Sequence, residues 1–142
     1  MIGVIITGHG YFADGLVSAM EVITGKQKKV KTVNFLAGDT SEILQANLIK
    51  AVSELECETI VFLTDIAGGS PFNQSVLLGK SLQQEGGVFS GTNVPFLLEV
   101  IFSREIDDLF TLQRNWLASE QIRIQVYSEQ KKTVCAQQFG GI

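Results

Sequence analysis

Ile2-Gly3-Val4-Ile5-Ile6-Thr7-Gly8-His9-Gly10 is an apolar run that ends in a Gly-His-Gly turn, which holds the only histidine of the chain. The apolar part, residues 2–7, is typical of a central parallel strand that is covered on both faces. From residue 11 to residue 23, apolar side chains recur at helical spacing. The pattern predicts that His9 lies where a buried strand ends and a helix begins. Helix N-termini favour anions, phosphate above all, so we predict that His9 is a nucleophile that carries a phosphoryl group.

The composition indicates one globular domain over residues 1–142. The chain is 45% hydrophobic with a formal net charge of −4, which disfavours disorder and nucleic-acid binding. It has no apolar run near the ~20 residues that a bilayer-spanning helix needs, and residues 1–6 lack the basic start of an export signal. Cys57 and Cys135 stand far apart in the sequence, which favours reduced thiols. We expect a cytoplasmic protein without direct membrane insertion.

Strand and helix patterns alternate along the chain, which predicts an α/β fold with a mainly parallel sheet. Further strands are expected at 30–35, 59–63, 88–90 and, from strict alternation, 122–127. Ser70 and Asn93 are expected to cap helices that follow them. The expected buried positions of the helix after residues 38–41 are Ile43, Leu44, Leu48, Val52 and Leu55, and the next helix is expected to run through Val76, Leu77 and Leu82. A last helix is expected at 106–119, with Trp116 packed in the core.

The first and third strands each end in a reactive side chain. In parallel α/β sheets, ligands bind beyond the carboxyl ends of the strands, where the strand order reverses. With the common order 2-1-3-4, that crevice lies between the loops that carry His9 and Asp65. A carboxylate that holds one imidazole nitrogen fixes the tautomer and leaves the other nitrogen free to attack. We therefore predict that Asp65 orients His9.

Small polar residues around this crevice are candidates for phosphoryl contacts. The Ser70 hydroxyl can bind a phosphoryl group and cap its helix at the same time, and glycines beside His9 admit close approach. The candidates are Ser70, Gly69, Thr64, Thr7 and Gly10. Thr7 and Thr64 have a second interpretation, as β-branched residues that simply end strands.

Other chemistries fit the sequence less well. Residues 8–13 match G-x-G-x-x-A, the dinucleotide fingerprint, but the acidic residue expected after the second strand is missing and His9 would crowd a pyrophosphate. A zinc site would need carboxylates beside the single histidine. A Ser70-His9-Asp65 hydrolase would lack the G-x-S-x-G elbow. We predict neither a cofactor nor a metal.

Three blocks of the chain, each on a different strand-to-helix loop, resemble one family. They are IITGHG at 5–10, FLTDIAGGSPFN at 62–73 and GTNVPFLLE at 91–99. Together they resemble the IIA proteins of the mannose–fructose–sorbose family of the bacterial phosphoenolpyruvate-dependent sugar phosphotransferase system (PTS). The Thr-Gly-His-Gly variant resembles the N-acetylgalactosamine/galactosamine branch. Mannose-type proteins have Ser-His-Gly where this chain has Gly-His-Gly, so one hydroxyl beside the histidine is absent.

The resemblance implies a flavodoxin-like three-layer sandwich and a phosphohistidine at His9, oriented by Asp65 with phosphoryl contacts around Ser70. Such a transferase accepts the phosphoryl group from the carrier protein HPr and passes it to a IIB protein, which serves sugar uptake through membrane IIC and IID proteins. Family members are cytoplasmic homodimers whose C-terminal strand is exchanged between subunits. Residues 122–127 are therefore expected to form this exchanged strand, at the antiparallel edge of the sheet. We expect partners to dock over Phe12 and residues 94–98, although core packing or a dimer contact is an equal interpretation for Phe96 and Leu97. The alternative function is a flavodoxin-like nucleotide- or flavin-binding domain, or a regulatory domain.

Overall fold

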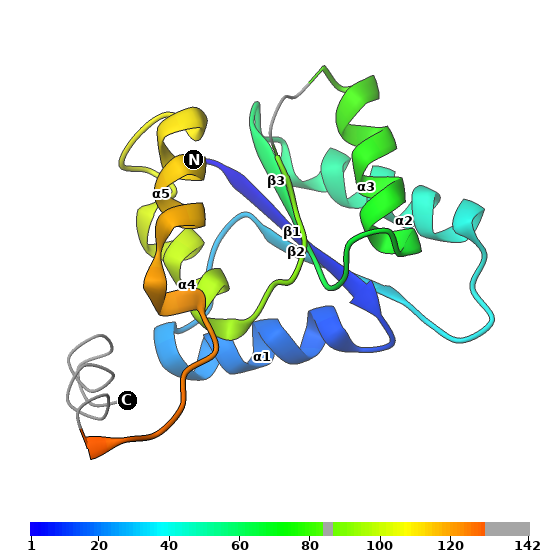
Figure 1. Ribbon diagram of the computed structural model, residues 1–142. Helices are drawn as coiled ribbons and strands as arrows, with labels where there is room; N and C mark the ends of the chain where they lie inside the picture. Colours follow the sequence, from blue (N-terminus) through cyan, green and yellow to red (C-terminus); the bar gives the residue numbers. More distant parts are fainter. Residues whose placement is uncertain (84–86, 130–142) are drawn as a thin grey trace.

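A computed structural model of the chain describes residues 1–83 and 87–129 (Figure 1). Four parallel strands form one sheet in the order β2-β1-β3-β4, as predicted. The strands are β1 (Gly3–His9), β2 (Val30–Phe35), β3 (Ile60–Thr64) and β4 (Val88–Phe89). The helices are α1 (Phe12–Thr24), α2 (Ser41–Leu55), α3 (Ser70–Ser81), α4 (Val94–Ser103) and α5 (Leu109–Ala118), followed by the short 3₁₀ helix η1 (Glu120–Ile122).

Helices cover both faces of the sheet, which confirms the three-layer α/β sandwich (Figure 1). One core lies between the sheet and α2 and α3, and includes Ile5 and Phe62. The other lies under α1, α4 and α5, and includes Ile6 and Leu63. Adjacent residues of β1 and β3 thus enter opposite cores, which explains why both strands are apolar without alternation. None of the described helices is long and apolar enough to cross a bilayer.

Local sequence chemistry accounts for several helix ends. Gly25 ends α1 with a positive φ of 80°, which a residue without a side chain adopts without strain. Thr40 and Asn93 cap α2 and α4, since their side-chain oxygens accept hydrogen bonds from the Ile43 and Phe96 N–H groups. Trp116 is buried, as predicted.

Four local expectations were wrong. The last helix begins at Leu109 rather than at 106, because the Asp108 carboxylate accepts the Thr111 N–H and so fixes the cap. Ile43 is exposed rather than buried, because it lies off the face of α2 that packs on the sheet. Gly69, not Ser70, is the N-cap of α3.

The fourth concerns residues 122–127, which do not form a strand. Only Ile122 is in regular structure, as the last residue of η1, and the chain then leaves the body of the protein (orange in Figure 1). A strand needs a neighbouring strand to supply hydrogen bonds, and none of the described strands lies beside this segment. Ile124 is 96% exposed as a result. Cys135 lies outside the described residues.

Candidate active site

His9 and Asp65 lie together at the carboxyl edge of the sheet. His9 is the last residue of β1, and Asp65 directly follows β3, whose Thr64 pairs with Thr7 of β1. The His9 backbone N–H donates to Asp65 Oδ2 at 2.9 Å, and His9 Nδ1 lies 2.6 Å from the same oxygen. One carboxylate oxygen therefore holds both the backbone and the ring of His9. This arrangement keeps the proton on Nδ1 and leaves Nε2 with a free lone pair.

The Asp65 carboxylate is held in its charged form. Burial raises its pKa, but hydrogen bonds from the His9 backbone, the His9 ring and the Ile66 N–H lower it by more, so the net pKa lies below its ordinary value of 3.8. The Ile66 N–H reaches Oδ1 at 2.8 Å, so both oxygens are engaged. The side chain of Asp65 is only 13% exposed, whereas that of His9 is 47% exposed. The orienting group is thus shielded while the nucleophile faces solvent.

Phe35, the last residue of β2, completes the support of the imidazole. Its ring meets the His9 ring edge-on, with centroids 5.8 Å apart. The Phe35 carbonyl also accepts the Gly10 N–H at 2.8 Å, which anchors the turn after His9. Gly10 has a φ of +58°, in the left-handed region that favours glycine. The sequence motifs did not point to Phe35, although the order 2-1-3-4 places the end of β2 beside the end of β1.

Gly69 lies against the other side of the His9 ring, at the N-terminus of α3. A Cβ added to Gly69 would lie 2.9 Å from His9 Cε1 and 3.7 Å from Nε2. The free nitrogen therefore faces the positive end of the α3 macrodipole. Pro71 has no N–H, so the free donors of the first turn are the amides of Ser70 and Phe72. Because Gly69 takes the capping position, the Ser70 side chain is not used as a cap.

The two threonines lie below the surface of the crevice. Thr7 and Thr64 are fully buried, and the Thr64 hydroxyl donates to the Phe89 carbonyl at 2.7 Å. The Thr64 hydroxyl is therefore committed to the sheet and does not face His9. The Thr7 hydroxyl is buried without a partner among the described residues. Their interpretation as residues that end strands fits this burial better than a phosphoryl contact.

Gly8 explains the missing hydroxyl beside the histidine. A Cβ at this position would lie 2.4 Å from Phe12 Cδ1 and 3.1 Å from Asp65 Cγ. No side chain fits there unless Phe12 moves, so glycine lets both Phe12 and the carboxylate approach the strand. Within residues 1–83 and 87–129, no group of three or more His, Cys, Asp or Glu side chains is placed to hold a metal ion.

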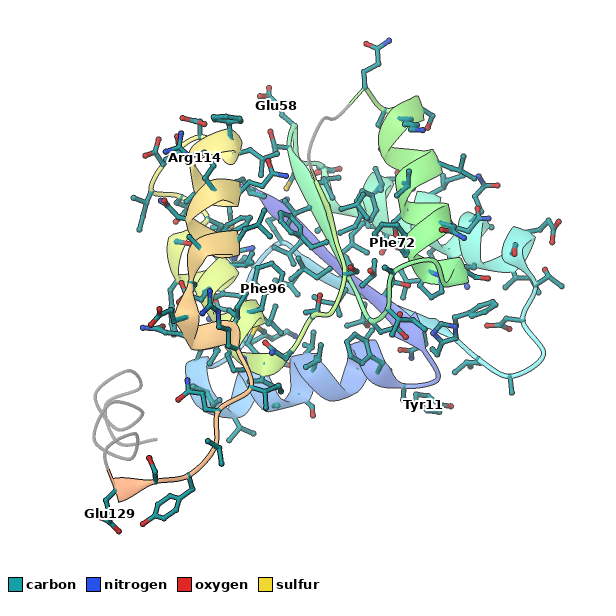
Figure 2. All side chains as sticks on the ribbon, viewed as in Figure 1. Tyr11, Glu58, Phe72, Phe96, Arg114 and Glu129 are labelled. Carbon is teal, nitrogen blue, oxygen red and sulfur yellow. The ribbon has the colours of Figure 1, made fainter. Side chains whose placement is uncertain are left out.

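The exposed apolar side chains near His9 are not those expected at a docking surface. Phe96, Leu97 and Leu98 are buried in the core under α4, so they do not form a docking surface, and the core-packing alternative for Phe96 and Leu97 is confirmed. Tyr11 and Ile66, which follow the two site loops, are exposed by 68% and 58% instead. Figure 2 shows Tyr11 pointing into solvent at the start of α1.

Gly69→Ala is expected to slow phosphorylation of His9 at least tenfold, because the new methyl group would push the ring off Asp65. The rate of phosphoryl transfer from phospho-HPr measures this effect. Gly15→Ala is the control, since a Cβ at Gly15 in α1 meets nothing within 4 Å. An unchanged rate in Gly69→Ala would show that the ring tolerates a neighbour on this side.

The lowered pKa of Asp65 makes its contribution to stability depend on pH. A carboxyl with a lower pKa in the folded state stabilises the fold above its ordinary value of 3.8, and this stabilisation is lost as the pH falls through the folded value. We expect the difference in free energy of unfolding between wild type and Asp65→Asn to be smaller below about pH 4 than it is at about pH 5. Urea unfolding at each pH measures it. A difference that grows on acidification would contradict the assignment.

The match to known proteins covers the strands and loops just described. Residues 3–113 match the family model EIIA-man, described as "PTS system fructose IIA component". The chain belongs to this family. It is a IIA component of the phosphotransferase system and a phosphoryl carrier, as the sequence blocks predicted, and the nucleotide- or flavin-binding alternative is not favoured.

Individual relatives agree with this assignment. The PTS system fructose-specific EIIA component of Bacillus subtilis is 35% identical over 135 residues, which cover 94% of this chain and 92% of the relative. The mannose-specific EIIAB component of Escherichia coli is 30% identical over 112 residues, 77% of this chain but 34% of that protein. The crystal structure of an EIIA component from Streptococcus agalactiae is 35% identical, with a TM-score of 0.76 over 82% of this chain and 90% of that one.

Proposed function

We propose that His9 is the residue of this IIA component that becomes phosphorylated, and that Nε2 is the atom that forms the bond to phosphorus. The observation that carries the proposal is the 2.6 Å contact between Nδ1 and Asp65 Oδ2. Because the carboxylate occupies Nδ1, only Nε2 has a lone pair available for attack. Nε2 also lies on the exposed side of the ring, toward the N-terminus of α3.

In both transfer steps, each bond that forms is matched by a bond that breaks, and no metal or cofactor takes part. The Nε2 lone pair attacks the phosphorus of phospho-HPr, the N–P bond to the histidine of HPr breaks, and that imidazole leaves with the electron pair. The His9 ring gains positive charge and keeps its proton on Nδ1, where Asp65 stabilises it. In the second step a nucleophile of the IIB protein attacks the same phosphorus and His9 leaves neutral. Phosphoryl transfer needs mainly positioning and charge stabilisation, which this site supplies.

We propose that the N-terminus of α3 holds the phosphoryl oxygens. The Ser70 hydroxyl and the Ser70 and Phe72 amides are the nearest free donors, and Gly69 and Gly10 let the group approach the backbone closely. The macrodipole of α3 adds about 0.3–1 kcal/mol for a negative group at its first turn.

We propose that HPr and the IIB protein dock in turn over Tyr11 and Ile66, the exposed apolar side chains beside the site. HPr is the donor and IIB the acceptor, and membrane IIC and IID proteins are reached only through IIB. We propose that these transfers take place in the cytoplasm and that residues 1–142 form a single domain. The galactosamine branch stays a prediction.

The test is intact-mass analysis after incubation with phosphoenolpyruvate, enzyme I and HPr. We expect the gain of one acid-labile phosphoryl group, with a phosphorus–nitrogen coupling to Nε2 in nuclear magnetic resonance (NMR) spectra of protein labelled with ¹⁵N. No gain, when the same enzyme I and HPr phosphorylate another IIA protein, would overturn the proposal. Phosphorylation on Nδ1 would overturn the role of Asp65 as the partner of that nitrogen.

We propose that two copies exchange residues 122–127 as an antiparallel edge strand. The support is twofold: the segment alternates apolar and polar side chains with Ile124 and Val126 exposed, and β4 is an edge strand that pairs only with β3 among the described strands. A paired partner would bury these side chains and satisfy the free edge of β4.

Sedimentation equilibrium is expected to give twice the mass of the chain. Ile124→Asp combined with Val126→Asp should shift the protein to monomer, because charged side chains would then enter the interface. Val22→Asp is the control, since Val22 is equally exposed on α1, far along the sequence from the segment. A wild-type monomer at micromolar concentration would contradict the exchange.

A further inference from the structure

Asn93 holds two segments at once, beyond its role as a helix cap. Its Oδ1 accepts the Phe96 N–H at 2.9 Å and caps α4. Its Nδ2 donates to the Ile122 carbonyl at 2.8 Å, across 29 residues of sequence. Ile122 ends η1 and begins the exposed C-terminal segment. The side chain of Asn93 therefore fixes the start of this segment to the loop that follows β4.

The two residues before Asn93 hold the backbone of the Asp65 loop. The Gly91 N–H donates to the Asp65 carbonyl at 2.7 Å, and the Thr92 N–H donates to the Thr64 carbonyl at 3.1 Å. Gly91 has a φ of +70°, a conformation that favours glycine and turns its amide toward the neighbouring loop. Residues 91–92 thus act as a bracket on the backbone of the residue that orients His9.

The contacts form a continuous path from the C-terminal segment to the nucleophile. It runs from Ile122 through Asn93 to the 91–92 bracket, then through Asp65 to His9 Nδ1. We propose that Asn93 is a positioning residue for phosphoryl transfer, which keeps the bracket in place by its bond to Ile122. This proposal rests on the proposed role of His9. It also links the site to the state of residues 122–127.

The physical reason is the tight geometry of the transfer. Asp65 must keep one oxygen within hydrogen-bond distance of both the His9 backbone and the His9 ring. A displacement near 1 Å in such a constellation costs up to about 10²-fold in rate. When the Asn93–Ile122 bond is lost, α4 still holds Asn93 through its cap and through the Leu97 N–H, but the bracket loses its tie to Ile122, and we expect the Asp65 carbonyl to shift with it.

Two variants separate the positioning role from the cap. Asn93→Ser and Asn93→Asp each keep an oxygen that can accept the Phe96 N–H, so α4 stays capped. Neither can donate to the Ile122 carbonyl, because serine is too short and an ionised aspartate has no proton to donate. We expect both variants to lower the rate of phosphoryl transfer from phospho-HPr about tenfold, with an unchanged KM for phospho-HPr.

A second measurement reports on the site directly. The chain has one histidine, so every imidazole ¹⁵N signal in its NMR spectra belongs to His9. In both variants we expect the protonated Nδ1 signal to shift toward that of a histidine that exchanges between tautomers. Thr40→Ala is the control: it removes the cap of α2, where Thr40 Oγ1 accepts the Ile43 N–H, and should lower the melting temperature without changing the rate or the signal.

A rate within twofold of wild type in either Asn93 variant would overturn the proposal. An unchanged Nδ1 signal together with a slower rate would also overturn it, because the loss would then not act through the Asp65–His9 pair. Failure of the proposed function is a different result: wild-type protein would then take up no phosphoryl group on His9.

Discussion

His9→Ala is expected to abolish acid-labile phosphorylation while the melting temperature stays within a few degrees of wild type. The chain contains no other histidine, so no second imidazole can replace the lost nucleophile. The fold should tolerate the change, because half of the His9 side chain is exposed and its ring is not part of either core. Intact-mass analysis with phosphoenolpyruvate, enzyme I and HPr measures the first effect, and thermal unfolding the second.

The matched control is Tyr11→Ala, which removes a more exposed ring two residues away. That variant should still be phosphorylated, although more slowly if Tyr11 contacts HPr. Continued acid-labile phosphorylation of His9→Ala would place the carrier group on another residue. A large drop in its melting temperature would indicate that His9 serves the fold rather than the transfer.

Asp65→Asn is expected to lower the rate of phosphoryl transfer about 10²-fold or more, the second-largest effect. The amide is nearly the same size as the carboxylate, but it has no negative charge to stabilise the imidazole as it becomes positive. It also cannot hold the Nδ1 proton as firmly, so the wrong tautomer becomes populated. In the aspartate–histidine pair of a serine protease, the same substitution lowers kcat about 10⁴-fold. Stopped-flow or quench-flow transfer from phospho-HPr measures the rate.

Asp108→Asn provides a control for the chemistry of the substitution. The Asp108 carboxylate, like that of Asp65, accepts a hydrogen bond from a backbone N–H, here that of Thr111, and it also accepts the Thr111 hydroxyl. Asp108 caps α5 and has no contact with His9. Its replacement should leave the transfer rate unchanged. A rate for Asp65→Asn within a few-fold of wild type would reduce Asp65 to a residue that shapes its loop.

The sequence was most informative where chemistry is local. The apolar runs of β1 and β3, with the common strand order 2-1-3-4, were enough to predict that His9 and Asp65 lie at one edge of the sheet. The caps Thr40 and Asn93 were predictable because a side-chain oxygen and the N–H that it caps lie within three residues of each other. Such contacts need no knowledge of the rest of the fold.

Contacts between distant segments could not be predicted in the same way. Ser70 looked like a cap because serine before proline usually is one, yet the loop geometry gives that position to Gly69 and leaves the hydroxyl free. Phe35 has an ordinary strand sequence, and nothing local shows that its ring meets His9. The predicted strand at 122–127 has the correct alternation, but a strand also requires a partner, which the described chain does not supply.

The sequence by itself determined the α/β sandwich, the family and the histidine at the end of the first strand, because periodic burial and short motifs are written in neighbouring residues. Only the tertiary structure decided which imidazole nitrogen is free, which side of the ring Gly69 occupies, and which backbone groups hold Asp65 in place. The hydrogen bonds that hold Asp65 join atoms about 3 Å apart from segments 26 to 56 residues apart, and Gly69 lies 60 residues from His9 in the sequence. Such distances are set by the packing of the helices on the sheet, not by any single stretch of the chain.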